Sequence, residues 1–207
     1  MKTWLFDILA CPIDKNFPLR LYIFSYETPN EKIDLILDNF KDRALEKIKS
    51  ENIIHLYQEN GEILIQDDLV LEKTPLLKYL KKVKKSLEEL DNIYDLSERV
   101  NIKTLLNYIR TDIHSKIEKS INNLPENGLD EILPELMLIN KYKFDIEIET
   151  GILFCPECKR WFPIIDTIPQ MLPDEYRNEK EELEFLKTNK NLLDEEFFHQ
   201  NLKPFNL

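Results

Sequence analysis

Two short segments near opposite ends of the chain carry the residues best suited to chemistry. The segment "CPEC" contains Cys155 and Cys158, and the segment "CPID" places Cys11 and Asp14 at the same spacing. Zinc prefers four ligands in a tetrahedron, and two knuckles that supply two ligands each are how zinc ribbons build such a site. Because thiolates and carboxylates both bind zinc, we predict a zinc site formed by Cys11, Asp14, Cys155 and Cys158.

Other interpretations of these segments stay open. Asp14 departs from a complete four-cysteine pattern, so the metal could have been lost, leaving packed turns in which Asp14 caps a backbone N–H. His199 is an alternative fourth ligand. A thiol redox role for Cys155 and Cys158 is a further hypothesis, but the segment lacks the strand-to-helix context that such a motif requires.

Composition excludes several classes of function. The chain has 207 residues and a formal charge of -11, which argues against a protein that binds the phosphate backbone of nucleic acid by itself. Its three glycines, Gly61, Gly128 and Gly151, are too scattered for a dinucleotide or phosphate-binding loop, so we expect no bound nucleotide or nucleotide-like cofactor. The histidines, His55, His114 and His199, form no catalytic pattern, so we expect no enzyme activity and no catalytic residue.

The pattern of apolar residues predicts a helical middle between two strand-containing ends. The expected helices are residues 3–9, 33–48, 76–90, 100–121 and 129–139, with one or two more after residue 173. The expected strands are residues 17–27 and 142–154, and residues 61–72 are expected to form a strand or hairpin. Pro134 is expected to break or kink the helix over residues 129–139. No apolar run is long enough to span a membrane, and the N-terminus lacks a cleavage site, so we expect a cytoplasmic protein.

Three blocks of sequence resemble one known family. "ILACP", "FPLRL" and "GILFCPECKRWFPIIDTIPQML", separated by a helical insertion, are similar to the small zinc-ribbon activator subunit of tRNA, rRNA and release-factor methyltransferases of archaea and eukaryotes. The matching segments cover about the first 26 residues and residues 142–173. Bacterial small zinc-ribbon proteins share a shorter version of this sequence motif.

The resemblance implies an α+β fold in three parts. Residues 1–29 and 141–173 would form one small zinc-ribbon-like β domain, residues 30–140 a helical insertion domain, and residues 174–207 a helical tail. It also implies a non-catalytic subunit that binds a class I S-adenosylmethionine-dependent methyltransferase as a heterodimer. Cofactor and substrate would sit on the partner, and nucleic acid would be contacted only through it.

The resemblance further implies a partner-binding strand over residues 163–172. The expected partner-binding residues are Phe162, Ile164, Ile165, Ile168, Pro169, Met171 and Leu172. An exposed apolar edge strand is prone to aggregation unless another chain pairs with it. We therefore predict that the strand binds the partner by addition to the partner's sheet. Without the resemblance, packing of these side chains against the protein's own helices is the simpler interpretation.

Two further segments of the chain are rich in charged residues. "KYLKKVKKSL" places five lysines around a helix, which would serve as an RNA-facing patch or, more simply, as a solvated face balanced by Glu88, Glu89 and Asp91. The acidic residues from Asp174 to Glu184 are expected to face solvent. The alternative function is a zinc-ribbon protein that binds nucleic acid or takes part in transcription, which should carry basic and aromatic residues on its knuckles.

Overall fold

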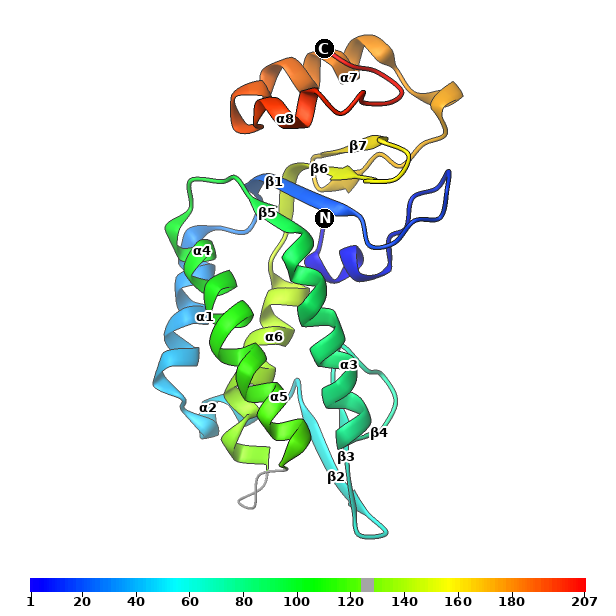
Figure 1. The fold of residues 1–207 in the computed structure, drawn as a ribbon. Coiled ribbons are helices and arrows are strands. Elements are labelled where there is room, and N and C mark those ends of the chain that lie inside the picture. Colours follow the sequence, from blue (N-terminus) through cyan, green and yellow to red (C-terminus); the bar gives the residue numbers. More distant parts are fainter. Residues whose placement is uncertain (124–128) are drawn as a thin grey trace. The chain divides into compact units, whose positions relative to one another are not determined.

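The computed structural model of the protein describes residues 1–123 and 129–207, which divide into two compact units (Figure 1). The first, here called the terminal unit, contains Met1–Thr28, Asp91–Glu98 and Ile146–Leu207. The second, the helical unit, contains Pro29–Leu90 and Arg99–Asp145. Helices and strands occur together, which confirms the α+β class.

The terminal unit is built on a five-stranded sheet in the order β5-β1-β6-β7-β8. Its strands are β1 (Arg20–Tyr26), β5 (Ile93–Asp95), β6 (Ile148–Phe154), β7 (Trp161–Ile165) and β8 (Ile168–Pro169), and a 3-10 helix, η1 (Thr3–Ile8), precedes them. Only β5 runs parallel to its neighbour, β1; the other adjacent pairs are antiparallel. Strands β1 and β6 approach so closely at Gly151 that a Cβ there would lie 2.5 Å from the Tyr22 carbonyl oxygen. A side chain at this position would therefore push the two central strands apart.

The C-terminal tail packs on this sheet as part of the terminal unit. It contains η5 (Asp174–Tyr176), α7 (Glu179–Thr188), η6 (Lys190–Leu192) and α8 (Glu195–Phe198). Leu186 and Phe197 are buried in one apolar cluster with Phe154 and Trp161 of the sheet. The Phe197 ring lies 5.5 Å from the Phe154 ring, centroid to centroid. Burial of such rings removes much apolar surface from water, so the tail stabilises the sheet.

Polar contacts fix the tail as well. The Trp161 N–H donates to the Lys203 carbonyl over 3.2 Å, and the Trp161 indole N–H donates to the Phe205 carbonyl over 3.0 Å. The buried Arg177 guanidinium pairs with Glu182 and lies over the ring of Trp161. The expectation that the acidic residues from Asp174 to Glu184 face solvent is therefore wrong for Glu182, because its carboxylate neutralises a buried cation.

The helical unit contains most of the helices and a small three-stranded sheet. Its helices are α1 (Asn30–Asp42), α2 (Leu45–Ser50), α3 (Leu76–Glu88), α4 (Val100–Tyr108), α5 (His114–Asn122) and α6 (Leu133–Asp145). A π-helical turn, η3 (Ile109–Ile113), joins α4 to α5; the 3-10 helix η2 (Glu89–Asn92) follows α3 and η4 (Leu129–Glu131) precedes α6. The sheet consists of β2 (His55–Glu59), β3 (Glu62–Gln66) and β4 (Thr74–Pro75).

A buried carboxylate anchors α3 within the helical unit. Asp67 accepts hydrogen bonds from the Leu69 and Val70 N–H groups, both at 2.9 Å. Its other oxygen accepts from the Tyr79 hydroxyl of α3 at 2.5 Å and from the Asn140 amide of α6 at 2.9 Å. Because a buried charge needs such partners, these bonds hold the loop before α3, α3 itself and α6 in one arrangement.

The structure corrects several predicted elements. The helix expected over residues 33–48 is two helices, because Arg43 adopts a left-handed conformation that ends α1. Residues 142–145, expected in a strand, belong to α6, and Pro134 lies in the first turn of that helix, where its missing N–H costs no hydrogen bond. The unit boundaries differ from the expected ranges in two places, since Asp91–Glu98 and the tail both belong to the terminal unit.

Among the described residues, none of the helices combines the length and apolar character needed to cross a bilayer.

We expect the substitution Phe197→Ala to destabilise the protein by about 3–5 kcal/mol, as is typical when a buried aromatic side chain is truncated. The reason is the loss of its ring contacts with Phe154 and Tyr22. The measurement is urea unfolding followed by circular dichroism, with Tyr176→Ala as the control, because Tyr176 is 73% exposed. Equal midpoints for the two variants would show that the tail does not support the sheet.

Candidate metal centre

The two cysteine segments fold into knuckles of the same backbone geometry. The Cys11 N–H donates to the Asn16 carbonyl over 3.0 Å, and the Cys155 N–H donates to the Arg160 carbonyl over 2.8 Å. In each knuckle the N–H four residues after the first cysteine returns a hydrogen bond to that cysteine's carbonyl, at 3.0 Å in both cases. Lys15 and Lys159, which donate these bonds, have φ values of 63° and 62°. Equivalent turns therefore present positions 11 and 14, and positions 155 and 158, in the same way.

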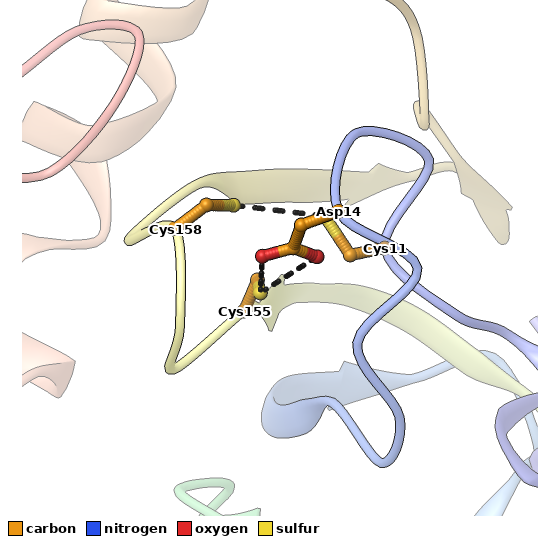
Figure 2. Close-up of side chains that lie close together, drawn as sticks. All are labelled: Cys11, Asp14, Cys155 and Cys158. Atoms are coloured by element: carbon orange, nitrogen blue, oxygen red, sulfur yellow. Dashed lines mark hydrogen bonds between the residues drawn. The ribbon is translucent and has the colours of Figure 1, made fainter.

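The four predicted ligands converge on one point between the knuckles (Figure 2). Their ligand atoms all lie within 4.8 Å of one another. The sulfurs of Cys11 and Cys158 are 3.6 Å apart, and the Cys155 sulfur lies 3.3 Å from Asp14 Oδ2. Residues from the two ends of the sequence thus form one group of three thiols and one carboxylate.

These spacings suit a tetrahedral metal ion. With Zn–S bonds of about 2.3 Å and Zn–O bonds of about 2.0 Å, a tetrahedron has S···S edges of about 3.8 Å and S···O edges of about 3.5 Å. The two distances given above are within about 0.2 Å of these edges. The donor set therefore fits zinc in both chemistry and size.

Without a metal, the site holds protonated thiols beside a charged carboxylate. Burial raises the pKa of the Cys11 thiol to about 12 and also raises the pKa of the Cys155 thiol. The pKa of the Asp14 carboxyl is lowered to about 2, chiefly because it accepts a hydrogen bond from the Asn16 N–H at 3.0 Å. The carboxylate is thus charged at neutral pH, whereas the two buried thiols need a cation to displace their protons.

His199, the alternative fourth ligand, is exposed and does not belong to the group of potential metal ligands. The structure therefore favours Asp14 for the fourth position.

The contacts of three basic residues around the knuckles, Lys15, Lys159 and Arg160, were not predicted from the sequence. The ammonium groups of Lys15 and Lys159 donate to the carbonyls of Pro12 and Pro156, over 3.0 and 2.5 Å. The repeated pattern Cys-Pro-x-x-Lys in both segments was the signal that could have identified them. Arg160 pairs with Asp174, with nitrogen to oxygen distances of 2.8 and 3.1 Å, and this pairing raises the pKa of the Arg160 guanidinium and lowers that of the Asp174 carboxyl.

The structure divides the expected partner-binding residues into two groups. Phe162 and Ile164 are fully buried in the terminal unit. Ile165, Ile168 and Leu172 are 37%, 59% and 42% exposed. Pro169 and Met171 are half-buried. The surface available to another chain is therefore the turn between β7 and β8 and the segment that follows it, and Phe162 and Ile164 support it from within.

Strand β8 offers few backbone donors to another strand. Ile168 pairs with Ile165 across a two-residue turn, and the Gln170 N–H donates to the Pro163 carbonyl over 2.8 Å. Pro169 has no N–H. A chain that docks at this edge would therefore rely on side chains more than on backbone hydrogen bonds.

Comparison with known proteins identifies one family. The family model described as "Trm112p-like protein" matches residues 2–166, which includes both knuckles and strands β1 to β7. A search of curated proteins finds no match to this chain.

We expect one metal ion per chain in the purified protein and less than a tenth of that in Cys155→Ala or Cys158→Ala, because each substitution removes one of four ligands. Asp14→Cys should retain the ion, since a thiolate replaces the carboxylate. The measurement is metal analysis by mass spectrometry, with Glu157→Gln as the control, because Glu157 is exposed in the same knuckle and outside the ligand group. Metal-free wild-type protein would contradict the assignment.

Proposed function

Because the chain belongs to the Trm112p-like family of methyltransferase activators, we propose that it binds and activates class I S-adenosylmethionine-dependent methyltransferases as a non-catalytic subunit. The clients would be cytoplasmic enzymes that methylate tRNA, rRNA or translation factors. The observation that carries this proposal is the family match over residues 2–166, supported by the assembled ligand group at positions 11, 14, 155 and 158.

The residue content of the chain supports a non-catalytic role. Three scattered glycines cannot build the clustered loop that brings a backbone close to a nucleotide-like cofactor. The three cysteines all lie in the metal-ligand group, so they are engaged when a metal is bound. In this proposal the cofactor and the methyl acceptor both bind the partner.

We propose zinc as the metal, with a structural role. Cys11 and Cys155 belong to knuckles that are 144 residues apart in sequence, and four protein ligands leave no open position for a substrate. An ion held by both knuckles would lock the N-terminal segment against the sheet. The four residues would hold the ion, and the only role of the ion would be to cross-link the two knuckles.

We propose the β7–β8 turn and residues 163–172 as the partner-binding surface. The apolar side chains of Ile165, Ile168 and Leu172 are exposed there, and β8 is the edge strand of the sheet. Strand addition would bring the partner's sheet to this edge, while the lack of donors at Pro163 and Pro169 limits the number of hydrogen bonds. Apolar contact on both chains would stabilise a client that is poorly soluble alone.

The alternative of a nucleic-acid-binding ribbon is less well supported. The cations of the knuckles are already engaged within the chain, since Lys15 and Lys159 donate to carbonyls and Arg160 pairs with Asp174. Few charges on the knuckles are therefore left for phosphate.

The experiment that tests the activator function is a pull-down of the tagged chain from its native lysate, followed by methyl-transfer assays. Methyltransferases recovered in one-to-one complexes, whose activity requires both chains, would establish it. Polymerase subunits or nucleic acid recovered without a methyltransferase would favour the alternative.

We expect Ile168→Asp to abolish co-purification of the methyltransferase, because a charge would be buried in the apolar contact. The thermal midpoint of the isolated chain should not change, since Ile168 is 59% exposed. Leu71→Asp is the matched control, because Leu71 is an apolar residue of the helical unit and is 78% exposed. If the Ile168 variant still co-purifies with its partner, the interface lies elsewhere.

A further inference from the structure

Helix α3 carries a row of lysines on its exposed face. Lys78, Lys81, Lys82 and Lys85 are all exposed and follow the spacing i, i+3, i+4 and i+7. Residues at these positions lie on one side of a helix. We call these four residues the lysine row. At 1.5 Å per residue the row is about 10 Å long, which corresponds to roughly three phosphates along one nucleic-acid strand.

The lysine row lacks the acidic partners that other lysines of the helical unit have. Seven lysines of this unit lie within ion-pair distance of a carboxylate: Lys32, Lys41, Lys49, Lys73, Lys84, Lys116 and Lys141. Among the described residues, no carboxylate oxygen lies within 4.0 Å of a lysine-row nitrogen, and Lys82 donates to the Leu69 carbonyl instead. Of the acids expected to balance the helix, Glu88 pairs with Lys84, which lies outside the row.

The apolar side of α3 is not available to enter a membrane. Leu76, Tyr79, Leu80, Val83 and Leu87 are buried within the protein. A helix that lies in a membrane interface needs such residues to enter the lipid. Because Tyr79 is also bonded to buried Asp67, α3 cannot turn this face outward without breaking the core contact. The exposed face is therefore a fixed, cationic surface, with one exposed apolar residue, Leu77, beside the row.

We propose that the lysine row binds the phosphate backbone of a nucleic acid, so that the chain itself contacts the RNA on which its partner acts. The contact goes beyond the proposed activator function, and only the identity of the nucleic acid as the partner's RNA substrate rests on that function. It differs from the expectation that nucleic acid is contacted only through the partner. In a chain of charge -11 the attraction is local, weak and strongly reduced by salt.

The test is binding of the full chain to a fluorescein-labelled tRNA transcript, measured by anisotropy from about 25 to about 300 mM KCl. The variant combines Lys78→Gln, Lys81→Gln, Lys82→Gln and Lys85→Gln. We expect its affinity to fall at least about tenfold at the lowest salt, and the slope of log affinity against log salt to become shallower by about 2 to 3, since each of the roughly three lost phosphate contacts contributes about 0.7–0.9.

The control variant replaces Lys47, Lys103, Lys180 and Lys187 with Gln, which removes the same charge from exposed positions on other helices. It should retain most of the affinity. An equal loss in both variants, no binding of tRNA by the wild-type chain at the lowest salt, or unchanged binding by the lysine-row variant would overturn the proposal.

Two further probes identify the source of the phosphate. If the ligand is RNA, we expect tighter binding to the tRNA than to a DNA duplex of equal charge. Row-dependent binding to anionic phospholipid vesicles but not to tRNA would overturn the proposal in favour of a membrane.

Co-purification of the methyltransferase with the lysine-row variant should be unchanged. Loss of methyltransferase recovery by the wild-type chain, with tRNA binding intact, would contradict only the activator function.

Discussion

The antiparallel pairing of β1 with β6 is the interaction on which the metal centre depends. Its register sets Arg20 opposite Phe154, so the loop before β1 and the loop after β6 leave the sheet at the same end. Cys11 and Cys155 then face each other although they are far apart in sequence. The close approach at Gly151 keeps the two strands at normal pairing distance, because no side chain intervenes. The sheet thus places the ligands, and a bound ion would in turn hold the sheet's ends together.

The sequence was most informative where chemistry is encoded in a few neighbouring residues. The spacing of two residues within each knuckle predicts both half-sites, and the structure brings all four predicted ligands together. The α+β class and most helices followed from apolar periodicity, which is strong in α3 and in α4 to α5. Such features depend on local spacing, so they are visible before any tertiary contact is known.

Features that depend on distant contacts were not predictable. Strand β5 has three residues, too few for a period of two to be recognised, and it is fixed by parallel pairing with β1 and by stacking of Tyr94 on Tyr22 at 4.9 Å. Residues 142–145 alternate like a strand but extend a buried helix, because tertiary packing outweighs a short local pattern. The continuous apolar run of β7 likewise did not reveal that Phe162 and Ile164 are buried, because that burial depends on contacts with distant parts of the chain.

The tail determines how much apolar surface the terminal unit leaves for a partner. The family match ends at residue 166, yet Leu186, Phe197 and Leu202 of the tail complete the cluster that buries Phe154 and Trp161. The bond from the Trp161 N–H to the Lys203 carbonyl, and the bond from the Lys203 N–H to the Lys159 carbonyl, also occupy the first part of the β7 edge. Beyond that part, β7 is covered by β8, which has little capacity for further strand pairing. Apolar side chains are therefore most accessible along this edge at the β7–β8 turn, and a partner bound at this proposed surface would be recognised by shape and apolar contact more than by backbone pairing.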